Sequence, residues 1–305
     1  MGKMSAFLFA LLGLSLLPLR GQDWERIKAD PSVIWGEGWG ASVEEADREA
    51  LASLASRIAV GVAGEFRSVE EQRTTSSGTE YSSFRRSRVE LVTNATLRNT
   101  GRTVLKGGRR AHVGRWIRRS ELDAVFAARE QRISDLVRCA GAAEEECRAG
   151  DALRCYWWAY VLLRSLPRPS ELRDVDGRML LNAIPDRMNG VLGDISVSAA
   201  KAGGRLLLSF RFRGLQVQDL AFSCFDGAGW SPRTEVNGGR AEVELAPGAL
   251  GEIVQLKIEY EYRNEALMDE ELSGLVSVQK SRMLKKALVI FRRQKPYDGG
   301  AYAAQ

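Results

Sequence analysis

The spacing of the apolar residues changes along this chain, and those changes constrain its fold more than any other feature. Apolar residues recur at helical spacing in residues 43–56 and again through 120–192, which predicts amphipathic helices. From residue 194 onward apolar and polar residues alternate, which predicts strands with one buried face. Because these strands follow one another instead of alternating with helices, the sequence predicts an α+β fold with antiparallel sheets.

The patterns divide the chain into five predicted segments. Its 305 residues exceed one ordinary domain, and an apolar content of 45% is enough for a sizeable core. The segments are a signal peptide at 1–21, an α+β domain at 22–119, a helical block at 120–193, an immunoglobulin-like β-sandwich at 194–293 and a disordered tail at 294–305.

The first domain is expected to pack one helix on one face of an antiparallel sheet. A strand at 31–40 leads into the helix, which begins at a capping box formed by Ser42 and Glu45. The strands expected after the helix are 58–66, 89–97, 102–107 and 110–118. The polar segment 72–88 predicts the tip of a long hairpin between the second and third of these five strands.

The helical block is expected to contain a helical hairpin and one further helix. The first helix is capped by Ser120 and runs to about Cys147, and Gly150-Asp151 is expected to turn the chain. A second helix at 152–166 ends before Pro167, and a third covers 176–192. Its aromatic run Tyr156-Trp157-Trp158 with Tyr160 indicates either core packing or a partner surface, because consecutive aromatics cover more than one face of a helix.

The C-terminal region predicts about seven strands, which is typical of an immunoglobulin-like architecture. One of them is expected to run from Val254 through Tyr262. A charged segment at 264–285 interrupts the last hairpin and has a helical composition.

The N-terminus has the three parts of a secretory signal. Lys3 precedes an apolar stretch at 4–19, and Gly21 is a small residue suited to cleavage; the alternative is an uncleaved N-terminal anchor. Cleavage after Gly21 removes two basic residues, so the mature charge is 42 − 39 = +3. We therefore expect a periplasmic or outer-membrane-associated protein, with only peripheral membrane contact and no nucleic-acid partner.

Export permits disulfides, and the chain has four cysteines: Cys139, Cys147, Cys155 and Cys224. Two interpretations remain open. A disulfide between Cys147 and Cys155 would close the helical hairpin, or all four residues are free buried thiols. No Cys-x-x-Cys motif indicates a zinc or redox site.

No constellation in the sequence indicates catalysis, so we expect no enzyme, no catalytic residue, no cofactor and no metal. Gly36, Gly38 and Ala41 fit a dinucleotide-binding fingerprint, but antiparallel hairpins follow where such a fold needs further βαβ units. We interpret these glycines as a tight strand-to-helix turn. His112 is the only histidine and has no nucleophile motif around it, which favours a structural role.

Arginines concentrate in the first domain and are the candidate partner-binding residues. The candidates are Arg85, Arg86, Arg88, Arg115 and Arg118. On adjacent strands they would form one basic face for an acidic protein or an anionic polymer, or else a solvated face balanced by nearby glutamates.

The segment IWGEGWGASVEEADREALASLASRIAVGV resembles the opening of the LPP-twenty lipoprotein-type domain, through Gly36–Gly40, Glu44–Leu54 and Ile58–Val62. VGRWIRRSELDAVFAARE and DALRCYWWAYVLLRSLP resemble later parts of longer members of this family, so the resemblance covers about 31–166. It implies an exported envelope protein of Gram-negative bacteria, without established catalysis and often at the outer membrane. A related domain in a flagellar assembly component implies a scaffolding or docking role. The family's lipidation cysteine is missing here.

The sequence thus predicts a non-catalytic exported scaffold or adaptor that docks other envelope proteins. The alternative is a binding module for an anionic envelope glycan such as peptidoglycan or lipopolysaccharide. Partners are expected at the hairpin tip, at the basic face or at the insertion 264–285.

Overall fold

The computed structural model describes residues 21–70, 100–202, 205–225, 229–244, 253–276, 288–292 and 302–303. The predicted signal peptide up to residue 20, the hairpin tip at 72–88 and the strand at 89–97 lie outside these residues. Contacts divide the chain into two compact units: residues up to 57 together with 99–119, and the remainder. Both units combine helices with antiparallel sheets, which confirms the α+β prediction.

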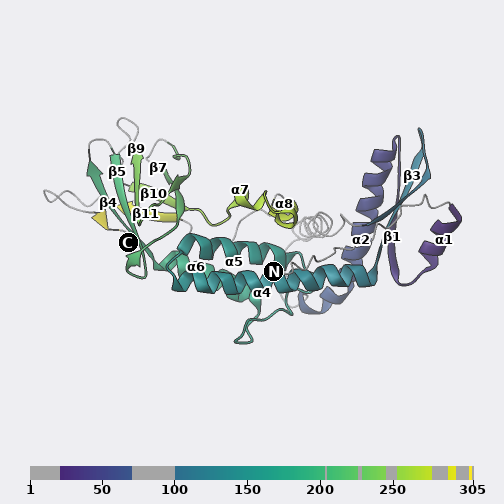
Figure 1. Ribbon diagram of the computed structural model, residues 1–305, viewed down its shortest axis with the longest axis horizontal. Helices are drawn as coiled ribbons and strands as arrows, with labels where there is room; N and C mark the ends of the chain where they lie inside the picture. Colours follow the sequence, from purple (N-terminus) through teal and green to yellow (C-terminus); the bar gives the residue numbers. More distant parts are fainter. Residues whose placement is uncertain are drawn as a thin grey trace, which may run out of the picture. The chain divides into compact units, whose positions relative to one another are not determined.

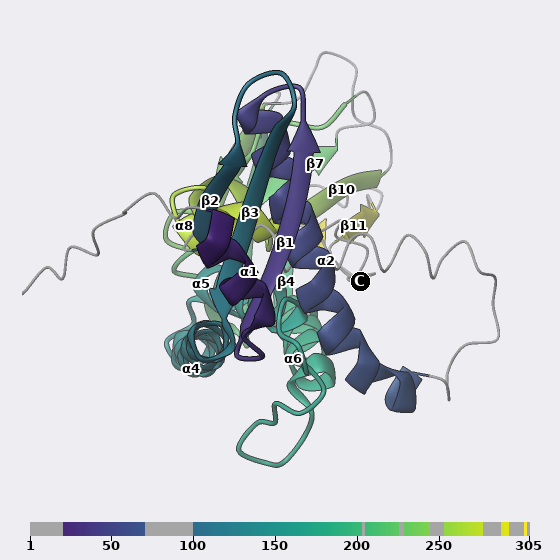
Figure 2. The ribbon, with the colours of Figure 1, turned by 90° about the vertical axis from the view of Figure 1, so that its right-hand side faces the viewer.

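The first unit contains a three-stranded antiparallel sheet with the order β1-β3-β2. The strands are β1 (Val33–Gly40), β2 (Gly101–Lys106) and β3 (Ala111–Arg118), as the alternation of apolar residues predicts. Helices α1 (Gly21–Ala29) and α2 (Val43–Glu70) lie on opposite faces of this sheet (Figures 1 and 2). The Ser42 cap is confirmed, since its Oγ accepts from the backbone N–H of Glu45, while the Glu45 carboxylate accepts from the N–H of Ala41, one residue before the N-cap.

Three glycines of β1 let α2 lie directly against the strand. Gly36, Gly38 and Gly40 alternate along β1 and therefore share one face. A Cβ atom on Gly38 would lie 2.1 Å from the backbone nitrogen of Ala50, and one on Gly36 would lie 2.3 Å from that of Leu54. The interpretation of these glycines as a tight turn is therefore wrong. They lie within the strand and provide the space that the α2 backbone occupies.

Helix α2 is longer than the sequence analysis predicts, and the strand expected at 58–66 is wrong. Residues Ile58 to Phe66 continue α2, which ends at Glu70. The alternation of Ile58, Val60 and Val62 suggests a strand, but the buried stripe of α2 recurs every four residues, and Leu54 and Ile58 are both buried in it. Extending an existing helix adds one hydrogen bond per residue without a new nucleation cost, which favours continuation.

The second unit contains a helical hairpin. Helices α4 (Arg119–Glu145) and α5 (Ala149–Arg164) run antiparallel, because Glu144 contacts Tyr156 near the turn and Arg129 contacts Ser165 at the far end. Helix α6 (Leu180–Asp194) packs beside α5 (Figure 1). All three predicted helices are present.

The predicted turn at Gly150-Asp151 is wrong, because both residues belong to α5. The chain turns at 146–148 instead, where Cys147 adopts a left-handed backbone with φ 57°. Gly150 is needed for a close approach: a Cβ there would lie 2.5 Å from the hydroxyl oxygen of Tyr262. Its backbone N–H donates to the backbone carbonyl of Asp219 at 3.2 Å. Asp219 of the β region thus supplies an acceptor for an N–H group in the first turn of α5, which has no partner within the helix.

The β region forms two antiparallel sheets. One has the order β11-β10-β7-β8, and the other has the order β12-β4-β5-β6 with β9 also paired to β5. The strands of the first are β7 (Ala221–Phe225), β8 (Thr234–Glu235), β10 (Ile253–Ile258) and β11 (Leu288–Arg292). Those of the second are β4 (Ile195–Ala202), β5 (Arg205–Phe212), β6 (Leu215–Gln216), β9 (Arg240–Glu244) and β12 (Tyr302–Ala303). The sheets meet through Phe210 and Phe222, whose ring centroids are 5.0 Å apart.

Two boundaries in this region differ from the sequence analysis. The strand expected to reach Tyr262 ends at Ile258, and Tyr262 has a left-handed backbone with φ 47° that directs the chain into a helix. The predicted disordered tail contains β12, whose Tyr302 pairs with Ala199 of β4. The expected helical character of the insertion is confirmed up to residue 276 by α7 (Arg263–Ala266) and α8 (Glu270–Val276), and residues 277–285 lie outside the described residues.

Candidate functional site

The structure separates the two described candidate arginines. Arg85, Arg86 and Arg88 lie outside the described residues. Arg115 and Arg118 are three residues apart on β3, so their side chains point to opposite faces of the sheet. The two residues therefore do not share one basic face, and a partner-binding role for each of the five arginines stays a prediction.

Arg115 is held by a carboxylate of α2. Its Nε and Nη2 atoms each donate to Asp47 at 2.7 Å, and Nη1 donates to the hydroxyl of Thr100 at 3.2 Å. Arg102 of β2 also approaches Asp47, at 3.2 Å. Burial alone would raise the pKa of Asp47, but the hydrogen bonds and charges of Arg115 and Arg102 outweigh it, so the pKa lies below its ordinary value. This arrangement fastens α2 to the sheet.

The opposite face of the sheet gathers aromatic side chains around Glu37. The Nε1 of Trp24 in α1 donates to the Glu37 carboxylate at 2.6 Å, and the His112 Nε2 lies 3.6 Å from the same oxygen. Trp39 stacks on His112 with ring centroids 4.6 Å apart and is 58% exposed. His112 is thus a packing partner of Trp39, consistent with the structural role expected for it.

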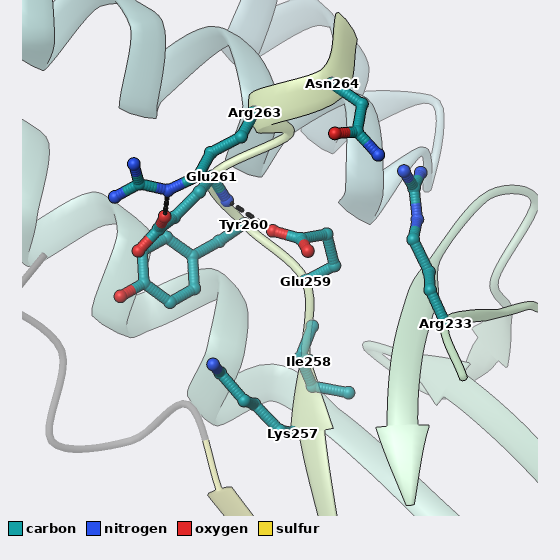
Figure 3. A pocket seen from close by; sticks show the side chains of 8 residues that line it. All are labelled: Arg233, Lys257, Ile258, Glu259, Tyr260, Glu261, Arg263 and Asn264. Carbon is teal, nitrogen blue, oxygen red and sulfur yellow. Dashed lines mark hydrogen bonds and ion pairs between the residues drawn. The ribbon is translucent and has the colours of Figure 1, made fainter. Parts of the chain in front are cut away.

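A pocket of about 320 Å³ lies where β10 leads into α7 (Figure 3). Its charged lining makes local contacts: Arg233 pairs with Glu265 at 2.8 Å, and Arg263 pairs with Glu261. The Glu259 carboxylate accepts from the backbone N–H of Glu261 at 2.8 Å. These contacts shape the chain between β10 and α7, so the pocket belongs to the base of the insertion.

The segment formed by α7 and α8, residues 263–276, is called the insertion below. It is fastened to the helical hairpin through Arg129 of α4, whose side chain is 0% exposed. The Arg129 Nε donates to Glu271 of α8 at 2.6 Å, and its Nη1 donates to the Ser165 hydroxyl at 3.0 Å. Arg132, one turn further along α4, donates to the second oxygen of Glu271 at 2.8 Å and also pairs with Asp269.

The turn between α7 and α8 exposes two large apolar residues, which we call the apolar tip. Leu267 is 61% exposed and Met268 is 91% exposed. Asp269 follows them directly, and its carboxylate accepts from the backbone N–H of Leu272 at 2.9 Å, which caps α8. The apolar tip therefore projects from a turn whose base is fixed by ion pairs and a helix cap.

The sequence predicts that partners meet the insertion, a prediction that stays open, but it does not predict which residues hold the insertion in place. Arg129 sits in an ordinary charged helix, and Glu271 is 142 positions away. The one available signal is an arginine on the apolar stripe of α4, between the buried Phe126 and Ile133. A cation at such a position indicates a buried partner.

The aromatic run of α5 serves core packing, one of the two alternatives. Tyr156, Trp157 and Tyr160 are buried, and Trp157 meets Tyr260 edge to face with centroids 5.5 Å apart. These contacts join α5 to the segment that follows β10.

Among the described residues, no group of three or more histidine, cysteine or acidic side chains is arranged to hold a metal ion. Within the same residues, no helix has the length and apolarity required to cross a membrane. No family model matches this chain, and no curated protein or solved structure matches it either.

Proposed function

We propose that this protein is a non-catalytic exported scaffold or adaptor of the cell envelope that docks other envelope proteins. The exported state rests on the predicted signal peptide at 1–21, and cleavage near Gly21 would release the mature chain. The docking role rests on one observation, the apolar tip on an insertion anchored by the buried Arg129.

The apolar tip has the properties of a docking element. Exposed apolar side chains that adjoin each other gain free energy when a partner covers them. The ion pairs of Glu271 and Asp269 order the turn before any partner arrives, so less conformational entropy is lost on binding. The chemistry that fits it is an apolar groove on an envelope protein, which takes up Leu267 and Met268.

The proposal includes a finer architecture. We infer that the two sheets form an immunoglobulin-like sandwich, supported by their antiparallel order and by the Phe210–Phe222 contact between them. We also propose that the first part of the chain is of the LPP-twenty type, on the resemblance in residues 31–166. Both types of domain are suited to assembly rather than to catalysis.

Site-specific photo-crosslinking in the native envelope tests the docking role. A photoreactive amino acid in place of Met268 is compared with the same amino acid in place of Arg138, whose side chain is 79% exposed on α4. We expect one or a few envelope proteins to be captured from position 268 in defined ratio and not from position 138. No adduct, or the same adducts from both positions, would reject the docking role.

A second variant separates docking from folding. L267S/M268S removes the apolar surface at exposed positions and is expected to leave the free energy of unfolding within about 0.5 kcal/mol of the wild type. Recovery of the crosslinked partners with this variant should fall by about tenfold or more. Unchanged recovery would show that the partner binds elsewhere.

The anionic-glycan alternative depends on Arg85, Arg86 and Arg88. It predicts co-sedimentation with peptidoglycan or lipopolysaccharide that weakens with salt and with replacement of these three residues by alanine. In the described part of the chain, Arg115 is already paired with Asp47, which favours the scaffold over this alternative.

A further inference from the structure

Two of the four cysteines meet across the helical hairpin. The Sγ atoms of Cys139 in α4 and Cys155 in α5 lie 3.3 Å apart. A disulfide bond is about 2.05 Å long, so bond formation would bring the sulfurs only about 1.3 Å closer. Rotation of the two side chains on neighbouring helices can supply a movement of this size.

We propose that Cys139 and Cys155 form an intramolecular disulfide when the protein meets a disulfide oxidant, and that this bond pins α4 to α5. This pairing differs from Cys147–Cys155, which is the disulfide in one of the two interpretations that the sequence leaves open. The inference does not depend on the docking role of the apolar tip, because the sulfurs and the tip lie on different elements.

The environments of the two sulfurs give them different roles. Cys139 is exposed and is the sulfur that an oxidant reaches first, whereas Cys155 is buried. Burial, together with the hydrogen bond to Cys139, raises the pKa of Cys155 to about 12, so this residue stays a thiol at neutral pH. We therefore assign Cys139 as the attacking sulfur and Cys155 as the resolving one.

The exchange balances with a small-molecule disulfide such as glutathione disulfide. The Cys139 thiol loses its proton to water, and its thiolate attacks the oxidant, forming a mixed disulfide and releasing one glutathione thiolate. Cys155 gives up its proton as it attacks the Cys139 sulfur of the mixed disulfide, the Cys139–Cys155 bond forms, and the second glutathione leaves as a thiolate that takes up this proton. Overall, two protein thiols are oxidised by two electrons and the oxidant is reduced to two thiols.

The other two cysteines lie elsewhere in the fold. Cys224 is buried in β7, where its backbone N–H donates to the hydroxyl of Ser231 at 3.0 Å. Cys147 lies at the turn between α4 and α5 with a left-handed backbone. Cys147 is therefore the control residue, since it lies in the same helical hairpin but takes no part in the contact between Cys139 and Cys155.

The experiment is oxidation of the full chain with glutathione disulfide, followed by alkylation of the remaining thiols and peptide mapping. We expect one linked pair of peptides containing Cys139 and Cys155, with Cys147 and Cys224 alkylated. C147S should behave as the wild type, and C139S should form no intramolecular bond. Four alkylated cysteines, or a bond that includes Cys147, would overturn the proposal.

A stability readout covers the case in which a variant folds poorly. The bond closes a loop of about 16 residues, so the oxidised wild type should melt about 5–10 °C above the reduced form. C139S should melt at the same temperature in both conditions, and C147S should show the full shift. A wild-type chain that forms the bond without any increase in Tm would contradict the claim that it pins the two helices.

Discussion

Arg129 and Glu271 are 142 positions apart in the sequence, yet the Arg129 Nε lies 2.6 Å from the Glu271 Oε1. The arginine is fully buried, and the glutamate belongs to the short helix α8. The pair fastens the insertion to α4 and thereby fixes the base of the turn that carries the apolar tip.

Removing the charge of Glu271 should destabilise the second unit strongly. In E271Q the buried guanidinium of Arg129 loses the charge of this carboxylate, and the loss expected for a broken buried pair is about 3 kcal/mol in the free energy of unfolding. Urea denaturation of the full chain measures it. D135N is the matched control, because it breaks the exposed Arg138–Asp135 pair of the same helix and should cost less than about 0.5 kcal/mol. Equal effects of E271Q and D135N would show that the buried pair has no special role.

Replacing Gly38 with alanine should disrupt the packing of α2 on the sheet. The new Cβ would lie 2.1 Å from a backbone nitrogen of α2, which cannot move without shifting the helix. We expect a loss of about 3 kcal/mol, the upper end of the cost of overpacking. Hydrogen exchange of residues 33–40 measures it, and G107A is the control because no atom lies within 4 Å of its added Cβ. If the backbone amides of residues 33–40 exchange as slowly in G38A as in the wild type, α2 does not lie against β1 as closely as the structure shows.

Acid should weaken the first unit through Asp47. Its pKa is lower in the folded state than in the unfolded chain, so its contribution to stability is complete above the unfolded value of about 3.9 and is lost as the pH falls through the folded value. As the pH is lowered from about 5 to about 2, we expect the urea concentration at the unfolding midpoint of the first unit to decrease. The same midpoint should decrease less in D47N. E49Q, an exposed change on the same helix, should keep the wild-type slope. If the urea midpoint of D47N falls with pH as steeply as that of the wild type, Asp47 is not the source of the loss of stability in acid.

Arg115 and Arg118 should respond differently to substitution. R115A leaves the Asp47 carboxylate without its bidentate partner and should cost about 1–3 kcal/mol. R118A alters an exposed side chain on the other face and should change stability by less than about 0.5 kcal/mol. Thermal unfolding of both variants measures the difference. A partner-binding assay is therefore informative for R118A, whereas a binding defect in R115A would first reflect its lower stability. Equal stabilities of the two variants would refute the expected difference between Arg115 and Arg118.

Much of the fold follows from local patterns that can be read in the sequence. The alternation in 102–107 and 110–118 predicts β2 and β3, and the capping box at Ser42 predicts the start of α2. The same reasoning fails at Ile58–Phe66, because alternation over a few residues also fits a helix whose buried stripe recurs every four positions. A local pattern cannot decide between the two when an existing helix can simply continue.

The candidate site was harder to predict, since its parts come together only in the folded chain. The segment 264–285 stands out in the sequence as a charged interruption of a strand pattern, but the sequence predicts neither the anchor of the insertion nor its apolar tip. Likewise, the glycines of β1 stand out as a motif, but their role depends on α2 lying against them. The pairing of Cys139 with Cys155 depends in turn on the register of α4 against α5.

Local spacing along the chain predicts the α+β class, helices α2, α4, α5 and α6, most strands and the position of the insertion, but not helix α1. These features depend on spacing along the chain, which local backbone geometry converts directly into helices and strands. The burial of Arg129 against Glu271, the pairing of Arg115 with Asp47 and the meeting of Cys139 with Cys155 arise only in the folded chain. Contacts between distant residues arise from packing, and packing distances are not encoded at any single position of the chain.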